Sequence, residues 1–347
     1  MGVRRVDERK RRVLQAIIDD YITGAEPVGS RTLARKYQFG VSSATIRNEM
    51  ADLEELGYLE QPHTSAGRIP SSKGYRYYVD YLMNQTTLSV EEVDRIGKIL
   101  RQKAQEIHSV IHQTVRILVE ATDCLAMVTT PEFSRSTLRH IQVMPLREDK
   151  ALLLMISDNG FTESKMIELP RTVTLPELQH ISRILTEHLA GQTVASLRRG
   201  VMRDLLIELN HYQDIVEHIL EHSESDESEP VDRLFMGGTT NMLRQPEFRD
   251  IEKIGDLLMT LEHQNTIYKL LKKEHSAKQQ GIRVVIGEEI EVQTIQECSL
   301  VATSYKLGGK TIGHIGVLGP RRMPYARVIA LVDAVAVSLN ELLEKHF

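Results

Sequence analysis

Residues 30–57 constrain the fold of this chain more than any other stretch, because two short helical patterns there flank a tight turn. The first pattern covers residues 31–37 and the second covers residues 43–56, with Gly40 supplying a permissive backbone between them. The residues suited to begin and end these helices are Ser30, Ser42 and Gly57. Two helices joined by a short glycine-containing turn are typical of the helix-turn-helix unit.

The helix predicted over residues 43–56 has two chemically different faces. Its core-facing positions are apolar: Ile46, Met50 and Leu53. The opposite positions follow the i, i+3, i+4, i+7 spacing and hold Ala44, Arg47, Asn48 and Ala51. The alanines let the helix approach base pairs closely, where Arg47 can bind guanine bidentately and Asn48 can bind adenine. The alternative is a surface helix with ordinary polar residues. The helix-turn-helix context favours base reading by Arg47 and Asn48, supported by Ser43 and Thr45.

A further helix is predicted from Asp7 to Thr23, with Asp7 as its N-cap and Gly24 just past its end. Its apolar stripe consists of Leu14, Ile17, Ile18 and Tyr21. Its first turn is crowded with the cations Arg9, Lys10, Arg11 and Arg12, preceded by Arg4 and Arg5. Cations there oppose the helix dipole. Either this is a solvated basic end or an external anion compensates it, and beside a helix-turn-helix we expect DNA phosphate.

A β-hairpin is predicted after the second helix of the unit. Residues 58–61 form one strand, residues 62–67 the turn, and Arg68 and Ile69 a returning strand that stops at Pro70. Such a hairpin is the wing of a winged helix, and a cation on it rests on phosphate or enters the minor groove. We therefore expect DNA contacts from Arg68 on the wing and from Arg31 at the preceding helix. The neutral donors expected on the wing are His63, Thr64 and Ser65.

Residues 71–84 predict a helix capped by Ser71 or Ser72 and rich in tyrosine. Tyrosines can stack on single-stranded bases, but on an amphipathic helix beside a reader of double-stranded DNA we favour packing.

The rest of the chain alternates helices and strands. The predicted helices cover residues 91–122, 176–190, 195–220, 247–258, 262–273 and 325–345. The predicted strands lie in CLAMVTTP, LRHIQVMPL, ALLLMIS, SKMIEL, LFMGGTTN, IRVVIG, SLVATSY and TIGHIGVLG, and an acidic, serine-rich linker covers residues 221–230. This order predicts an α+β multidomain protein in which one α/β domain is interrupted by an inserted one, at about residues 135–228.

Catalytic, cofactor and metal sites are not expected. His108 and His112, like His218 and His222, are spaced i, i+4 on a helix but lack a clear third ligand. The GGKT run at 308–311 lacks the upstream glycine of a phosphate loop and is interpreted as a hairpin turn. An enzyme carrying a DNA-binding domain is the alternative, and activity dependent on His218 and His222 would be its sign.

Charge alone does not support nucleic-acid binding, and the absence of export and membrane segments favours the cytoplasm. Net charge is -5, with 13 Lys and Arg against 11 Asp and Glu in residues 1–85. No apolar run reaches the roughly 18 residues of a membrane span, and no export signal is visible. Cys124 and Cys298 are therefore expected to be reduced core thiols in a cytoplasmic protein without membrane contacts.

The run SSATIRNEMADLEELGYLEQPHTSAGRIPSSKGYRYYVDYL, residues 42–82, closely resembles the heat-inducible transcription repressor HrcA family of bacteria. Weaker similarities to that family lie in MGGTTNMLRQPEF at 236–248 and GHIGVLGPRRMPYARVIALVD at 313–333. The resemblance implies a homodimeric repressor that binds an inverted-repeat operator in double-stranded DNA upstream of chaperone genes. It also implies that the GroEL chaperonin keeps the repressor active and that heat relieves repression.

The implied architecture has three domains. A winged helix-turn-helix would occupy residues 1–85, a GAF-like domain residues 86–134 and 229–347, and an inserted dimerisation domain residues 135–228. A dimer suits an inverted repeat, because both have two-fold symmetry. The alternative within this architecture is a regulator whose GAF-like domain senses a small molecule.

Overall fold

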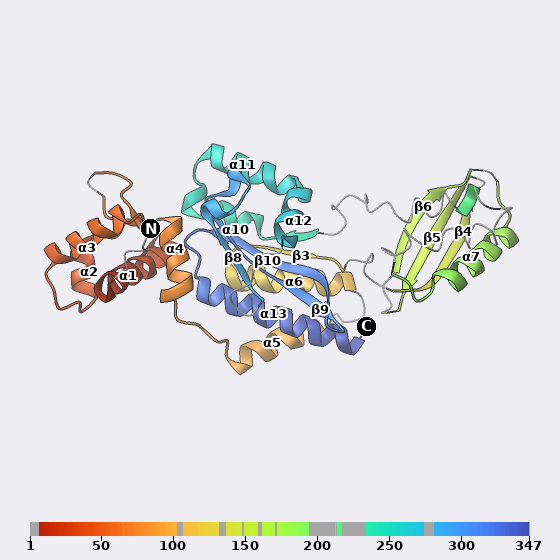
Figure 1. Ribbon diagram of the computed structural model, residues 1–347, viewed down its shortest axis with the longest axis horizontal. Helices are drawn as coiled ribbons and strands as arrows, with labels where there is room; N and C mark the ends of the chain where they lie inside the picture. The colour runs from red at the N-terminus through yellow and green to blue at the C-terminus, as the bar shows by residue number, and fades with distance from the viewer. Residues whose placement is uncertain are drawn as a thin grey trace. The chain divides into compact units, whose positions relative to one another are not determined.

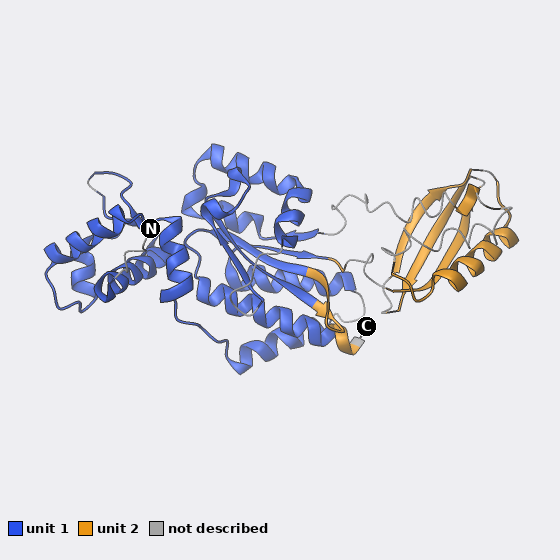
Figure 2. Ribbon diagram, viewed as in Figure 1, with its two compact units in different colours: residues 1–129, 234–305, 314–342 blue, residues 130–233, 306–313, 343–347 orange. Residues whose placement is uncertain are grey.

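The computed structural model describes most of the chain as an α+β protein. The described residues are 7–64, 66–102, 107–131, 137–147, 149–158, 162–170, 172–193, 212, 214–216, 234–273 and 281–346. The strands form sheets of two, five and three strands. Two compact units emerge (Figure 2): unit 1 contains Met1–Thr129, Leu234–Tyr305 and His314–Leu342, and unit 2 contains Thr130–Arg233, Lys306–Gly313 and Leu343–Phe347.

Residues 7–82, here called the N-terminal module, contain the predicted helix-turn-helix and hairpin (Figure 1). The elements are α1 (Glu8–Gly24), α2 (Ser30–Lys36), α3 (Ser43–Glu55), β1 (Leu59–Glu60), β2 (Ile69–Pro70), α4 (Ser72–Tyr77) and the π-helical turn η1 (Tyr78–Leu82). Two predicted boundaries were wrong. Gly29, not Ser30, is the N-cap of α2. Gly24, predicted just past the end of α1, is its last residue, and the C-cap Ala25 adopts the left-handed conformation with φ 54°.

The tyrosine-rich helix packs into the protein, as predicted. Tyr75 and Tyr78 are buried. The Tyr78 hydroxyl donates to Asp19 of α1 at 2.8 Å, and Ser71 caps α4 by accepting from the Gly74 N–H at 3.0 Å. Packing thus accounts for Tyr75 and Tyr78, whereas Tyr81 is 70% exposed.

The remainder of unit 1, here called the sheet body, is built on five strands in the order β7-β3-β10-β9-β8. Its strands are β3 (Leu125–Thr129), β7 (Leu234–Gly237), β8 (Arg283–Ile286), β9 (Cys298–Leu307) and β10 (Lys310–Pro320). Its helices are α5 (Val90–Arg101), α6 (Ile107–Thr122), α10 (Thr239–Leu243), α11 (Ile251–Glu262), α12 (Gln264–Lys272) and α13 (Tyr325–His346). Short 3-10 turns are η6 (Pro246–Phe248), η7 (Gly287–Glu289) and η8 (Gln293–Ile295).

Helices cover both faces of this sheet. Leu125 and Met127 of β3 share a buried cluster with Leu257 of α11 and Leu271 of α12. Since side chains alternate along a strand, Ala126 and its alternate neighbours point to the other face, and α6 packs against β3 there. Alternation of this kind explains why every residue of β3 is buried.

One predicted helix is two in the structure. The pattern over residues 91–122 predicts a single long helix, but α5 ends at Arg101 and α6 begins at Ile107. The two helices pack against each other. A single straight helix could not do this, because its two halves would lie end to end rather than side by side.

Two smaller predictions in the sheet body are confirmed. Gly308 and Gly309 have φ values of 56° and 78° and turn β9 into β10, as the hairpin interpretation of GGKT requires. Cys124 and Cys298 are buried and not joined in a disulfide. Burial raises the pKa of Cys124 to about 12, which makes it an unreactive core thiol.

Unit 2 contains the predicted meander and the helix that follows it. The strands β4 (Leu138–Arg147), β5 (Lys150–Ser157) and β6 (Thr162–Glu168) pair antiparallel in that order, and α7 (Leu175–Leu189) packs on β4. Ser182 and Thr186 of α7 accept from the N–H groups of Val143 and Ile141 at 2.9 and 3.0 Å. Most of the helix predicted at 195–220 and the linker predicted at 221–230 lie outside the described residues.

Within the described parts of the chain, no helix has both the length and the apolar character needed to cross a membrane. The three-domain limits stated above stay a prediction, since the chain separates into two units rather than three.

Candidate nucleic-acid interface

Helix α3 has one buried face and one exposed face, as its sequence predicts. Ile46 and Leu53 are completely buried, and Met50 is 4% exposed. The exposed residues on the other side are Ala44, Arg47, Asn48 and Ala51. Among the described residues, none forms a hydrogen bond or an ion pair with the side chain of Arg47 or Asn48. The two side chains are therefore available to an external partner.

The start of α3 is fixed by its N-cap and by the turn before it. The Ser42 hydroxyl accepts from the Thr45 N–H at 3.2 Å and contacts the Thr45 hydroxyl at 3.1 Å. Gly40, with φ 69°, occupies the left-handed region that favours glycine. Ser43 and Thr45 are half-buried at this end, so they lie beside the exposed face rather than at its centre.

The turn is tied to α1 by aromatic side chains. The Tyr37 hydroxyl donates to Asp20 of α1 at 2.8 Å, and partial burial raises the pKa of Tyr37. The Phe39 ring lies 5.9 Å from the Tyr37 ring, and the Arg12 guanidinium lies 5.7 Å from the centre of the Phe39 ring. These contacts hold the turn, and with it the start of α3, against α1.

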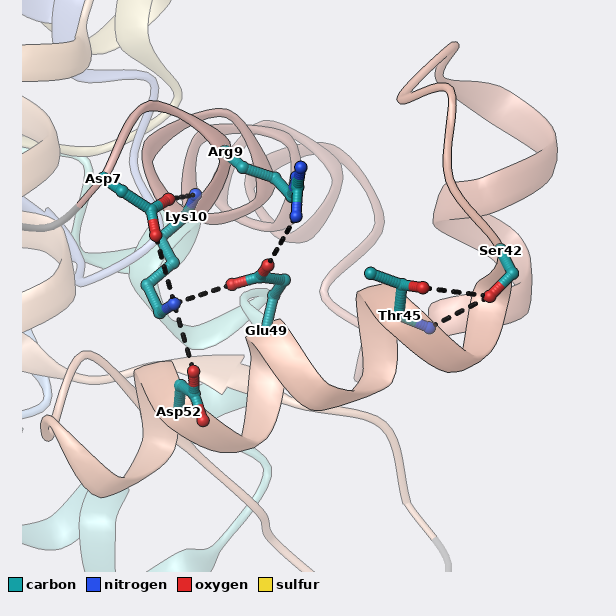
Figure 3. A network of polar contacts seen from close by, with 7 residues as sticks. All are labelled: Asp7, Arg9, Lys10, Ser42, Thr45, Glu49 and Asp52. Carbon is teal, nitrogen blue, oxygen red and sulfur yellow. Dashed lines mark hydrogen bonds and ion pairs between the residues drawn. The ribbon is translucent and has the colours of Figure 1, made fainter.

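A polar network inside the module neutralises part of the basic cluster of α1 (Figure 3). Lys10 forms ion pairs with Glu49 and Asp52 of α3 at 2.8 and 3.0 Å and with Asp7 at 3.2 Å. Arg9 reaches Glu49 at 3.4 Å. Hydrogen bonds to Glu49 and Asp52 raise the pKa of Lys10. The expectation that an external anion compensates Lys10 is therefore wrong, because carboxylates of α3 do so.

The predicted hairpin forms, and a third segment joins it. Leu59 pairs with Pro70 and Glu60 with Ile69. Arg68 exchanges two backbone hydrogen bonds of 2.9 Å with Val28, which precedes α2. Gly67 is required there, because a Cβ atom would lie 2.4 Å from the Val28 carbonyl oxygen.

The described residues at the tip of the hairpin are exposed. His63 and Thr64 both face solvent. The Gln61 amide holds the loop by donating to the carbonyls of Thr64 and Ala66 at 3.0 and 3.1 Å. Ser65, the third predicted donor, lies outside the described residues. Arg31 is exposed in the first turn of α2.

Arg68 differs from the other predicted site residues because its side chain is paired within the protein. Its guanidinium forms an ion pair with Glu54 of α3 at 2.7 Å, and its side chain is only 18% exposed. The side chain thus fastens the hairpin to α3 instead of extending into solvent. The hairpin position is consequently coupled to the helix that carries Arg47 and Asn48.

Sequence reasoning missed the acidic partners. Glu49 is 8% exposed and lies on the buried side of α3. The sequence does indicate that Glu49 needs a partner. It lies one turn from Ile46 and from Leu53 on the apolar stripe, and a buried carboxylate must be paired with a cation. The sequence does not show which cation pairs with Glu49, because Lys10 lies in another helix.

The described pair of candidate metal ligands contacts an aromatic ring. His108 and His112 stand edge-on to the ring of Phe235, at 5.8 and 4.4 Å between ring centres. No group of three or more His, Cys, Asp or Glu residues in the described ranges is placed to hold a metal ion. His218 and His222 lie outside those ranges.

Comparison with known proteins extends over the whole chain. The family model described as HrcA protein C terminal domain matches residues 108–329. A heat-inducible transcription repressor HrcA of Symbiobacterium thermophilum is 45% identical over 339 residues, covering 97% of this chain and 98% of the relative. The corresponding protein of Pelotomaculum thermopropionicum is 44% identical over 98% of each chain. The chain belongs to the HrcA family.

Membership of this family of transcription repressors confirms the expectation that the chain is not an enzyme. A crystal structure described as a hypothetical protein at 2.2 Å resolution is 25% identical, with a TM-score of 0.62 over 99% of this chain and all of that one. HrcA proteins are named transcription repressors, and the exposed face of α3 is the feature of this HrcA chain suited to DNA.

Proposed function

We propose that this chain represses transcription of heat-shock chaperone genes by binding an inverted-repeat operator as a homodimer. The observation that carries the proposal is the exposed face of α3, where Arg47 and Asn48 lie between two exposed alanines and engage no described residue. A helix that packs on the core through Ile46, Met50 and Leu53 and presents such a face is suited to the major groove.

The specific contacts come from two side chains. The planar guanidinium of Arg47 donates two parallel hydrogen bonds to guanine, and the Asn48 amide pairs with adenine through one donor and one acceptor. Their position in the first half of α3 supports this assignment, because that part of a recognition helix reaches the base edges. Repression follows from occupying an operator that overlaps the promoter.

The remaining contacts go to phosphates. Arg31 is exposed at the start of α2, and Ser43 and Thr45 are half-buried at the start of α3. His63 and Thr64 extend the contact from the hairpin tip. Such contacts fix the register of the protein on DNA without reading the sequence.

Arg68 acts on DNA indirectly in this proposal. Its ion pair with Glu54 holds the wing against α3, so that the hairpin tip and the recognition helix approach DNA together. Direct phosphate binding by Arg68 would require the guanidinium to leave a carboxylate 2.7 Å away.

The remaining domains supply symmetry and control. In this proposal a winged helix-turn-helix domain at residues 1–85 contains the N-terminal module. Residues 86–134 and 229–347 form a GAF-like domain, and the insertion at 135–228 dimerises. A two-fold dimer of readers matches an inverted repeat. The DNA that it binds lies in the cytoplasm, which is therefore its compartment.

Temperature acts on repression by changing the fraction of correctly folded dimer. A long multidomain chain passes through aggregation-prone intermediates when it folds. The GroEL chaperonin, by restoring the folded dimer, would keep repression in force, and heat would deplete the active pool.

A footprint on the chaperone promoters of the source organism tests the proposal. With folded dimer, and with chaperonin added to a partly inactivated sample, we expect protection of one inverted repeat that overlaps a promoter. If neither sample protects such a repeat, the chain is not an operator-binding repressor of these genes.

A regulator that senses a small molecule is the second candidate, and one observation favours it. A pocket of about 480 Å³ lies in the sheet body beside α12, lined by Thr266, Lys269, Leu270, Lys272, Lys273, Glu291 and Val292. Its volume falls within the range of small-molecule sites, roughly 300–1,000 Å³. Titration of anionic metabolites against operator affinity separates this candidate from chaperonin control.

A further inference from the structure

Three arginines join the N-terminal module to the sheet body within unit 1. They are Arg76 of α4 and two consecutive residues after β10, Arg321 and Arg322. Each guanidinium bonds at least one group across the boundary between module and body. We call this group of contacts the arginine joint.

Arg76 reaches from the module into the body. Its Nε donates to Glu289 at 2.7 Å, and a second N–H binds the other oxygen of the same carboxylate. A further N–H donates to the Val284 carbonyl of β8 at 2.6 Å. A bidentate pair fixes orientation as well as distance, because the two planar groups must be coplanar.

Arg322 reaches from the body into the module. It donates to the Ile22 carbonyl in the last turn of α1 at 3.3 Å. Within the body it donates to Glu247 at 2.6 Å and to the Gln245 side-chain oxygen at 2.8 Å. A cation at a helix C-terminus meets unpaired carbonyls and the negative end of the dipole. This second attachment point therefore holds α1, the helix on which α3 packs.

Close packing fills the space between the two attachment points. The rings of Tyr75 and Tyr325 lie 5.9 Å apart, and both are buried. Arg321 donates to the Ser72 hydroxyl at 3.3 Å. Gly287, with φ 56°, approaches so closely that a Cβ atom there would lie 2.2 Å from the Ser72 oxygen. The module and the body are thus in direct contact over α4 (Figure 1).

A rigid joint has a consequence for a dimer that reads two half-sites. Domains joined by small polar interfaces usually move relative to each other. If the module moved freely, the separation and rotation of the two recognition helices would vary, and operators with different spacers would bind equally. Directional bonds at two ends of the module restrict its movement on the sheet body, and with it the variation in both quantities that arises at this joint.

We propose that the arginine joint sets the half-site spacing that this repressor accepts. Arg76, Arg321 and Arg322 are positioning residues in this role, since none of them lies on the exposed face of α3. The inference rests on the proposed function, because it presupposes a dimer on an inverted repeat.

The test compares Arg76→Gln with wild type on a series of operators whose spacer is native or changed by 2 bp. A change of 2 bp moves one half-site by about 7 Å and turns it by about 70°. We expect wild type to bind the altered operators at least roughly tenfold more weakly than the native one. Arg76→Gln should discriminate by less than about threefold, and Arg76→Lys, which keeps the charge but not the fork, should lie between.

Two controls separate positioning from folding. The ratio of affinities is measured on the same protein sample, so a smaller folded fraction cancels. Arg116→Gln removes an exposed Arg–Glu pair on α6, whose partner is Glu120, and should keep the wild-type ratio. If Arg76→Gln does not fold, the spacer preference of Glu289→Gln is measured instead. This variant keeps the local hydrogen bond, because its amide oxygen can still accept from the Ile286 N–H.

The outcomes are distinguishable. If wild type binds no inverted repeat, the proposed function fails. If wild type binds but accepts all spacers equally, or if both Arg76→Gln and Glu289→Gln keep its preference, the arginine joint does not set the spacing and the inference is wrong.

Discussion

Replacing Arg47 by alanine tests the assignment of the DNA-reading face most sharply. Arg47 is exposed, and within the described parts of the chain its side chain has no hydrogen bond or ion pair. Its removal should change the free energy of unfolding by no more than about 0.5 kcal/mol. The loss of a bidentate guanine contact costs about 1–3 kcal/mol per half-site. If two half-sites add, a dimer loses about 2–6 kcal/mol, a drop in affinity of at least roughly 30-fold.

The assay is fluorescence anisotropy with labelled operator at fixed salt, paired with thermal melting of the same samples. Operators substituted at single base pairs supply the specificity signature: Arg47→Ala should become indifferent to one base pair per half-site that wild type discriminates. Arg116→Ala on α6 is the matched control, since it also removes an exposed arginine. If folded, dimeric Arg47→Ala binds the operator as wild type does, the recognition-helix assignment is refuted.

Three further substitutions give distinct signatures. Arg31→Ala should weaken binding evenly across sequences and reduce the slope of log affinity against log salt by about 1; an unchanged slope would show that Arg31 contacts no phosphate. Arg68→Ala should instead lower the free energy of unfolding by about 1 kcal/mol, because it breaks a pair with Glu54, and should leave the salt slope unchanged; a flatter slope would restore the direct phosphate contact. A hydrogen bond from Arg327 lowers the pKa of Glu92 to about 2 from its ordinary 4.5, so the pair stabilises the fold above pH 4.5 and is lost as the pH falls through 2. The difference in Tm between wild type and Glu92→Gln should shrink over that acid range, and a constant difference would contradict the pair.

Local patterns were sufficient to predict the elements of the N-terminal module. Asp7, Ser42 and Gly57 mark helix ends through chemistry that acts over three or four residues. The spacing of Ile46, Met50 and Leu53 identifies the buried face, and the exposed face follows from it by geometry alone. For the same reason the last helix and the β9–β10 hairpin were predicted close to their observed limits.

Long-range partners could not be predicted in the same way. Arg68 was expected to contact DNA because its partner Glu54 lies on α3, and the pairing of the two residues is visible only in the folded chain. Lys10 looked like a phosphate ligand because its carboxylate partners lie about forty residues away, on α3. Which cation is paired inside the protein depends on how α1, α3 and the hairpin pack, and local residue patterns do not show that packing. The arginine joint is the same kind of feature, since Arg322 meets Ile22 only in the folded chain.

The most direct test of the central claim is selection of binding sites from a pool of random DNA duplexes by the folded wild-type dimer. The account predicts that the recovered sequences share a two-fold symmetric inverted repeat with one fixed spacer, and that Arg47→Ala recovers the same repeat with one base pair per half-site no longer specified. Recovery of sequences without two-fold symmetry, or of an unchanged motif by Arg47→Ala, would contradict it.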